Sequence, residues 1–332
     1  MNVPAYRLQI GSRVVDTTDE PRASTLVQLA VSLDLDTPVD NATLVLGRVD
    51  GLHPAREDEL AIDLGYADDD AGLTRVLTGT IVTTEPGLVT DRVVGHGAGH
   101  PLLRTFLDRT FEDSTAGAIV RELADAASLS IARIEDGISF PAYVVDGRRS
   151  LSEHLRDLAD LCGFDAYVDF DGKLVFERFA TGRTVHVLEY AVDVLALDAL
   201  EAPARAGVVE AWGESPGGSR GGEAWAWLTK DFGALRGTGG TGPPTLLLER
   251  PALRTGAAAA SAARALATTI GRRSLRGRLV TLGRPEIRLG DAVRIRSAPD
   301  DDLNASFQVR SVTHRLSKAR GFVTVVGFRS VI

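Results

Sequence analysis

Two histidines four positions apart are the first residues in this sequence that could hold a metal ion. His96 and His100 lie in the hexapeptide GHGAGH, which spans residues 95–100. Histidines at positions i and i+4 share a metal when a helix places both on one face, as in metal-dependent hydrolases. The three glycines disfavour a helix, and the hexapeptide contains no acidic third ligand. We therefore expect the chain to change structure here, and a metal-dependent hydrolase is the alternative.

The other potentially reactive side chains lie in patterns that are typical of structural roles. His154 and Cys162 lie on or beside the apolar stripe of an expected helix. We expect a partly buried, hydrogen-bonded histidine and a cysteine that packs as a small hydrophobe. His186 and His314 alternate within strand-like segments and are expected on sheet surfaces, and His53 is expected in a loop.

Two further groups of residues could bind a ligand. Asp300, Asp301 and Asp302 form a run, but a calcium loop needs spaced ligands and a glycine bend, so a solvated turn is favoured. Trp225 and Trp227 alternate in EAWAWL and could bind a sugar or stack on a base. Burial against a neighbouring subunit is the commoner use of such residues, and a sugar-binding module stays open. No residue is predicted to be catalytic, to bind a cofactor or to ligate a metal.

Composition bounds the class of protein. The chain has 332 residues, of which 44% are hydrophobic, and a formal net charge of −8. An acidic chain is poorly suited to wrapping nucleic acid or binding an anionic membrane. The single cysteine excludes an intrachain disulfide. No signal peptide is expected at the start and no apolar run could span a bilayer, so we expect a protein made in the cytoplasm.

The elements expected to position these residues change in type along the chain. Alternating apolar residues predict short antiparallel strands over residues 1–97, in a sandwich or small barrel. Residues 98–180 predict a compact α+β unit with two helices, one capped by Ser114 and one by a Ser150–Glu153 capping box and ended by Gly163. A hairpin around Asp171–Gly172 follows. Residues 181–332 return to strands, with a loop and helix insertion around 214–274.

An internal duplication links the first and last parts of the chain. LGRVDG (46–51), DELAIDL (58–64) and GLVTDRVVG (87–95) recur in order as LGRPEI (282–287), GDAVRIR (290–296) and GFVTVVG (321–327). The second copy ends near VVGFRSVI, whereas the first continues from VVG into HGAGHPLL. The duplication predicts two related barrels, and it places GHGAGH at the exit from the first barrel into the α+β unit.

Four segments resemble the phage late-control D family, the baseplate hub proteins of contractile tails. They are FLDRTFEDSTAGAIVRELADAASLSI, GRRSLSEHLRDLADLCGFDAYVDFDGKLVF, LVTLGRPEIRLGDAVRIRS and FQVRSVTHRLSKARGFVTVVGF. They are also similar to the hub portion of type VI and extracellular contractile injection spike proteins. The resemblance implies a mainly β fold with an α+β insertion, in which two duplicated tail-tube-like antiparallel β-barrels carry a small α+β domain.

The resemblance also implies partners. It suggests a homotrimer whose six barrels join a hexameric inner tube to a trimeric spike, with baseplate wedge proteins around it. The chain ends at Ile332, just after the last expected strand, so the spike is expected to be a separate polypeptide. The expected location is the bacterial cytoplasm during assembly and then the baseplate of a phage tail or injection particle. An enzyme, a cofactor, a membrane and specific nucleic-acid binding are not expected.

Overall fold

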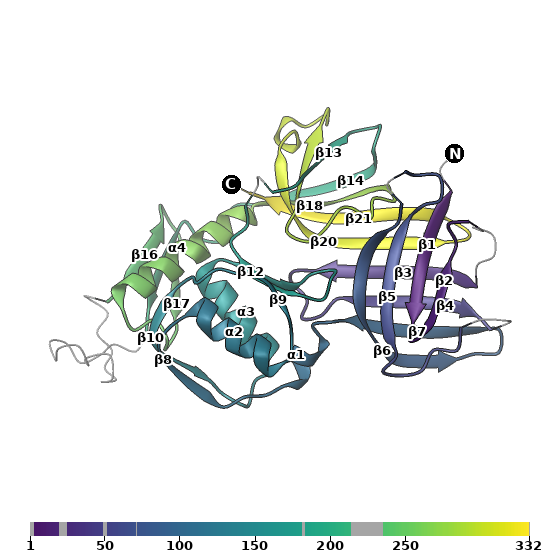
Figure 1. Cartoon of the computed structure of the whole chain (residues 1–332). Helices are drawn as coiled ribbons and strands as arrows, with labels where there is room; N and C mark the ends of the chain where they lie inside the picture. Colours follow the sequence, from purple (N-terminus) through teal and green to yellow (C-terminus); the bar gives the residue numbers. More distant parts are fainter. Residues whose placement is uncertain are drawn as a thin grey trace.

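The computed structural model describes residues 3–19, 25–48, 52–70, 72–180, 183–213 and 235–331. The fold is mainly β, as the alternating pattern predicted. One large curled sheet lies at one end of the molecule, and a unit that contains the helices lies at the other (Figure 1). The tryptophans Trp225 and Trp227 and the glycine-rich segment 214–223 lie outside the described residues.

The strands that precede the helical unit make up what we call the first half-sheet. Alternate residues of these strands are buried, as in β4, where Ala42, Leu44 and Leu46 face the core and their neighbours do not. The strands are β1 (Pro4–Ile10), β2 (Arg13–Asp16), β3 (Leu26–Asp34), β4 (Asn41–Gly47), β5 (Glu59–Tyr66), β6 (Thr74–Pro86) and β7 (Thr90–Gly97).

The second half-sheet follows the helical unit in the sequence. Its strands are β13 (Val185–Glu189), β14 (Val194–Glu201), β18 (Leu275–Leu282), β19 (Ala292–Arg296), β20 (Ser306–Ser317) and β21 (Gly321–Ser330). The short 3₁₀ helix η2 (Asp301–Leu303) connects β19 to β20. β20 pairs with β3 in antiparallel fashion, so the two half-sheets form one continuous sheet.

Both half-sheets have the same strand order. The first runs β3-β4-β7-β6-β5-β1, and the second runs β14-β18-β21-β20-β19-β13, which matches it position by position in chain order. One pairing differs in direction, because β1 is antiparallel to β5 whereas β13 is parallel to β19. The spatial order therefore repeats as the sequence duplication suggested, although the second copy is not wholly antiparallel.

Residues matched by the duplicated tripeptides face opposite sides of their strands in β4 and β18 and in β7 and β21. Leu46 is fully buried, whereas Leu282, its counterpart in the LGR match, is 59% exposed. Likewise Val93 is buried and the matched Val325 is not. Because successive side chains of a strand point to opposite faces, a shift by one residue exchanges the buried and exposed sets.

The middle of the chain forms the predicted α+β unit. Its elements are α1 (His100–Arg104), β8 (Arg109–Thr115), α2 (Ala116–Ala126), β9 (Ile131–Ile134), β10 (Ser139–Val145), α3 (Leu151–Cys162), β11 (Asp165–Val168) and β12 (Leu174–Glu177). The capping box of Ser150 and Glu153 is present, and Gly163 ends α3 in the left-handed conformation. The predicted cap of α2 is wrong by one residue, because Thr115 and not Ser114 accepts the hydrogen bond from the backbone N–H of Ala118.

The insertion within the second half-sheet is longer than predicted and belongs to a different core. It lies between β14 and β18 and contains β15 (Val208–Trp212), β16 (Gly237–Gly240), β17 (Thr245–Glu249) and α4 (Gly256–Arg272). Its buried residues, such as Val209 and Ala259, join the core of the α+β unit, while one separate core runs through both half-sheets. In Figure 1 α4 and β16 accordingly lie on the side of α2 and α3.

Candidate functional site

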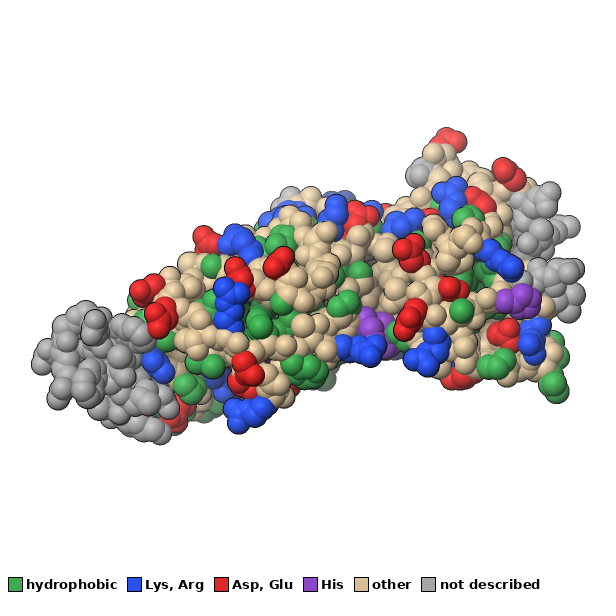
Figure 2. Space-filling model, turned by 60° about the horizontal axis from the view of Figure 1, so that its bottom comes forward, with side chains coloured by type: hydrophobic (Ala, Val, Ile, Leu, Met, Phe, Trp, Pro, Cys, Tyr) green, Lys and Arg blue, Asp and Glu red, His purple; other side chains and the backbone are tan. Residues whose placement is uncertain are grey.

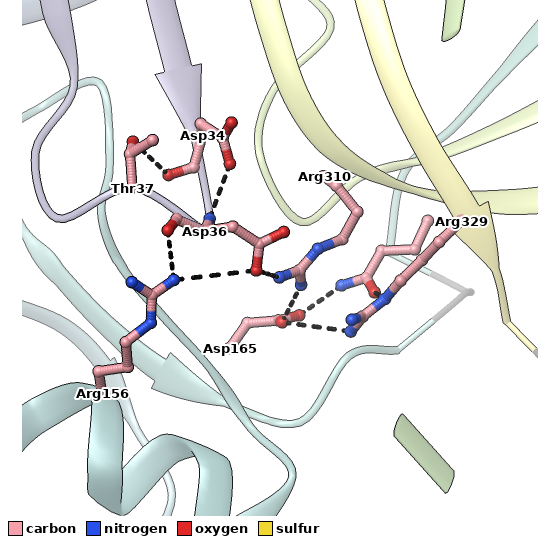
Figure 3. A network of polar contacts seen from close by, with 8 residues as sticks. Asp34, Asp36, Thr37, Arg156, Asp165, Arg310 and Arg329 are labelled. Carbon is pink, nitrogen blue, oxygen red and sulfur yellow. Dashed lines mark hydrogen bonds and ion pairs between the residues drawn. The ribbon is translucent and has the colours of Figure 1, made fainter. Parts of the chain in front are cut away.

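Ion pairs join the α+β unit to both half-sheets at one junction (Figure 3). Asp165, the first residue of β11, accepts a hydrogen bond of 2.6 Å from Nη1 of Arg310 on β20. The other amino group of Arg310 donates to Asp36 Oδ1, also at 2.6 Å, and Asp36 lies in the turn between β3 and β4. The guanidinium of Arg310, which belongs to the second half-sheet, thus links the α+β unit to the first half-sheet.

Further contacts surround this central link. Arg329 on β21 lies 3.8 Å from Asp165 and donates to the side chain of Gln308, which in turn donates to Asp165. Arg156 on α3 donates to the backbone carbonyl of Asp36. We call the set Asp36, Arg156, Asp165, Gln308, Arg310 and Arg329 the junction network.

The centre of the junction network, Asp165, Arg310 and Arg329, is largely buried, whereas Asp36 and Arg156 at its margin are about half exposed. Burial disfavours the charge on Arg310, but the carboxylates of Asp165 and Asp36 more than offset this and raise the pKa of its guanidinium. Burial on its own would raise the pKa of the Asp36 carboxyl, but the nearby charge of Arg310 outweighs this, so the pKa is lowered overall. Burial lowers the pKa of Arg329 to about 10. Because such buried pairs are costly to break, the network fixes how the three parts meet.

A cavity of about 860 Å³ lies beside this junction. It is lined by the β3–β4 turn, the start of α1, α3, the β11–β12 hairpin and the loop before β19. Asp40 lies at its wall, and burial raises the pKa of this carboxyl to about 7. The guanidinium of Arg288 stacks over the ring of Phe170 at 3.7 Å. Acidic and basic side chains are both present, so the cavity has no single preferred ligand charge.

The histidine pair of GHGAGH lies where β7 ends and α1 begins. His96 is on β7, His100 is the first residue of α1, and their Nδ1 atoms are 2.9 Å apart. Burial lowers the pKa of both imidazoles. The chain thus changes structure here, as expected, yet the two rings meet without a shared helix. Within the described part of the chain, no three His, Cys, Asp or Glu side chains are placed to hold a metal ion.

The remaining histidines have structural surroundings. His154 is buried on α3 and its Nε2 lies 3.0 Å from the carbonyl oxygen of Asp146, while His186 pairs with Asp291 at 2.8 Å. The prediction for His314 is wrong, because this residue is fully buried rather than on a sheet surface. It lies on β20, its ring packs near Phe322 and its Nδ1 lies 3.0 Å from Thr324 Oγ1, and burial lowers its pKa to about 3.

Two other predicted groups have ordinary surroundings. Burial raises the pKa of the Cys162 thiol to about 11, so this side chain packs as a small hydrophobe. Asp300 caps the first turn of η2 by accepting from the backbone N–H of Asp302, and the run of three aspartates forms a solvated turn. His53 is exposed in a loop.

Free strand edges distinguish the two half-sheets. β14 is the last strand of the sheet order, and within the described part of the chain only β18 pairs with it. β6 pairs with β7 from Gly79 to Pro86 and with β5 only as far as Ile81, so residues 82–86 have one strand neighbour among the described residues. An uncovered edge carries free N–H and C=O groups that can pair with another chain.

Two hairpin tips lie at one end of the sheet, on the side away from the α+β unit. The tip between β6 and β7 carries Leu88 and Val89, which are 98% and 75% exposed. The tip between β20 and β21 carries Lys318 and Arg320 instead. Both hairpins point the same way, because β20, β3, β4, β7 and β6 are successive antiparallel neighbours.

The face shown in Figure 2 carries acidic and basic side chains in alternation, with small apolar areas between them. No helix of the described residues is long and apolar enough to cross a membrane. The junction network was not predicted from the sequence. Its partners are far apart along the chain, as with Arg310 and Asp36, and each residue looks like an ordinary charged residue of a turn or strand.

Comparison with known proteins gives similarity in structure rather than in sequence. No family model matches the chain, and no curated protein matches it. The 43 kDa tail protein of prophage MuSo2 from Shewanella oneidensis has a TM-score of 0.69 at 15% identity, covering 98% of this chain and 97% of its own. The tail protein from Neisseria meningitidis MC58 has a TM-score of 0.72 at 12% identity, covering 98% of this chain and 96% of its own.

A component of a secretion system has a similar structure. The E. coli c3393 protein, a component of the type VI secretion system with structural similarity to the T4 bacteriophage tail proteins gp27 and gp5, has a TM-score of 0.59 at 10% identity. The match covers 97% of this chain and 76% of that protein. This chain therefore has the fold of phage tail proteins, which a component of type VI secretion shares.

Proposed function

We propose that this chain is a structural baseplate hub of a contractile tail or contractile injection system. Three copies would form a ring in which the two half-sheets of each copy provide six related units. Such a ring joins a hexameric inner tube on one face to a trimeric spike on the other. It is a symmetry adapter and not an enzyme.

One observation carries this proposal, namely that a single strand order occurs twice in one chain. A chain with two equivalent units can present sixfold contacts to one partner while keeping threefold contacts for another. The similarity to phage tail proteins over nearly the whole chain supports the same conclusion. The junction network supports it as well, because it holds the two units and the α+β unit in fixed positions.

The proposal assigns partners to the parts of the chain. The two units at residues 1–97 and 181–332 form the ring and contact the inner tube and a separate spike protein. The α+β unit at residues 98–180, with the inserted β15–β17 and α4 beside it, lies at the other end of the molecule and faces baseplate wedge proteins (Figure 1). The hub is assembled in the bacterial cytoplasm and then belongs to the baseplate.

Light scattering on the purified protein tests the oligomeric state that this function needs. We expect a mass three times the 35.3 kDa of one chain, either alone or on addition of the spike encoded nearby. A monomer under both conditions contradicts the proposal. The junction variant Asp36→Ala, folded but with a loosened first half-sheet, is expected to assemble less well than the exposed control Asp16→Ala.

The alternative of a metal-dependent tail or cell-wall hydrolase rests on His96 and His100 alone. A catalytic zinc site needs three protein ligands and an open position. The imidazole pair provides two nitrogen atoms 2.9 Å apart, and within the described residues no third ligand completes a metal-binding group. Stoichiometric metal in the purified protein, lost in His96→Ala, would revive this alternative.

A further inference from the structure

The pairing of β20 with β3 shows how one unit of this chain can bind the next. β20 is held along one side by β21. Along its other side, residues 306–308 pair with β19 and residues 311–317 pair with β3. A single strand thus belongs to its own half-sheet through its first part and to the neighbouring half-sheet through its second part.

β6 has in the first half-sheet the position that β20 has in the second, except for the contact with a neighbouring half-sheet. It pairs with β7 along one side, and its first part pairs with β5 along the other. Residues 82–86, which correspond to the part of β20 that pairs with β3, have no partner on that side among the described residues. Thr83 and Glu85 are exposed.

β14 has the position of β3 in the second half-sheet. Both pair on one side with the corresponding strand, β4 or β18. On the other side β3 pairs with β20, whereas no strand formed by the described residues pairs with the outer edge of β14. Leu195 and Leu200 of β14 are 57% and 52% exposed. Charges and bulges hinder pairing at a strand edge, and β14 has Asp198 and a bulge between Val194 and Ala196. β3 has a bulge at the equivalent place, between Leu26 and Gln28, and still pairs with β20, so a bulge there is compatible with pairing.

We propose that the free edge of β14 pairs in antiparallel fashion with residues 82–86 of β6 in a second copy of this chain. The contact repeats between copies the pairing that β20 and β3 make within one copy. This inference rests on the proposed hub function and specifies which surfaces build its ring.

The two surfaces are different, and each copy carries one of each. Such a contact is heterologous, so copies add head to tail and the ring closes when the rotation per copy divides a full turn. Main-chain hydrogen bonds provide the pairing, and the exposed leucines become covered in the process, as in strand addition to a sheet edge. The partner is therefore a second copy of the chain and not a peptide of another protein.

Cysteine cross-linking of the full-length protein tests the contact. Ala199→Cys on β14 is combined in turn with Thr83→Cys, Thr84→Cys and Glu85→Cys on β6, so that residues of both strand faces are sampled. Within one copy six strands separate β14 from β6 in the sheet, so a disulfide between them joins two copies. The native Cys162 is largely buried and its thiol pKa is raised, so it gives little background.

We expect at least one combination to give a cross-linked ladder that ends at three chains on a non-reducing gel. The matched control combines Ala199→Cys with Val14→Cys, an exposed position on β2 away from the β6 edge, and is expected to stay uncross-linked. A protein that is trimeric in light scattering, but whose three combinations do not exceed this control, overturns the inference and leaves the hub function standing. A protein that stays monomeric with and without the spike contradicts both.

Discussion

The two half-sheets share a strand order, but they differ at one edge. In the first, the edge of β3 is paired with β20 along residues 28–34, whereas in the second β14, in the same position, carries exposed leucines and has no paired strand on its outer edge among the described residues. The outer strands also differ, since β1 is antiparallel and β13 parallel to its neighbour. A repeat within one chain thus keeps the topology that its core requires, while its edges diverge according to what each must contact.

Removing the charge of Asp165 is expected to have the largest effect, because this residue ties the second half-sheet to the rest. Asp165→Ala leaves the largely buried Arg329 without a carboxylate and Arg310 with Asp36 alone, and removing one partner of such a buried pair costs about 3–5 kcal/mol of unfolding free energy. Urea unfolding measures the loss. Glu122→Ala, which breaks the exposed pair with Arg109, is the control and is expected to cost about 0–1 kcal/mol. Equal losses in both variants would refute a structural role for the junction network.

Large-to-small changes in each half-sheet test whether the two halves unfold together. Leu44 and Leu279 are both fully buried, one in each half, and belong to one core. Each change to Ala is expected to cost about 2–5 kcal/mol and to shift one shared unfolding transition. Calorimetry would show two transitions, with only one of them shifted by each variant, if the half-sheets were independent domains.

The buried histidine of β20 predicts a pH dependence that resides in the second half-sheet. The pKa of His314 is lowered to about 3, below its unfolded value of about 6.5, so between these values the unfolded chain binds the extra proton. Stability is therefore lost as the pH falls through this window, by at most about 1.4 kcal/mol per pH unit.

The His314→Gln variant is expected to lose this slope, as measured by urea unfolding between pH 7 and pH 4. Asp40 contributes in the opposite direction, because its raised pKa of about 7 makes the folded state bind a proton above the unfolded value. The difference between variant and parent isolates His314 from this opposing contribution. His53→Gln, which changes an exposed histidine, serves as control, and a slope unchanged in His314→Gln would show that the imidazole titrates normally.

The smallest effect on stability is expected at the apolar hairpin tip of the first half-sheet. Leu88→Lys makes this tip resemble the basic tip of the second and touches no packed side chain. We expect the free energy of unfolding to change by less than about 0.5 kcal/mol. A clear destabilisation in thermal unfolding would mean that Leu88 is packed in solution, against the chain itself or a second copy.

Local features of this fold were predictable from the sequence, and contacts between distant segments were not. The capping box at Ser150 and the stop at Gly163 depend on neighbouring residues, and both are present. The cap of α2 moved by one residue because the Ser114 hydroxyl donates back to the carbonyl of Glu112, while the Thr115 hydroxyl accepts from the backbone N–H of Ala118. The register of the duplication was missed because matched tripeptides do not show which face of a strand is buried.

The same limit applies to the candidate site. His314 looks like a strand surface residue, since nothing beside it in the sequence shows that its face of β20 is turned inward, where the ring contacts Phe322 and Thr324. Asp36, Asp165 and Arg310 come from three separate parts of the chain and meet only when the fold is complete. The histidine pair, by contrast, was found from spacing alone, but spacing did not reveal that a strand end and a helix start would bring the two rings together.

The β6–β7 and β20–β21 hairpin tips differ in chemistry, so they distinguish the two half-sheets at this end of the sheet. Leu88 and Val89 occupy one tip, and Lys318 and Arg320 occupy the equivalent tip of the same chain. Around a ring of alternating half-sheets, the rim at this end would repeat once per chain and not once per half-sheet. A partner that binds these tips would then have as many equivalent orientations as there are chains. Rotating it by one half-sheet would bring its apolar contacts against the basic tips.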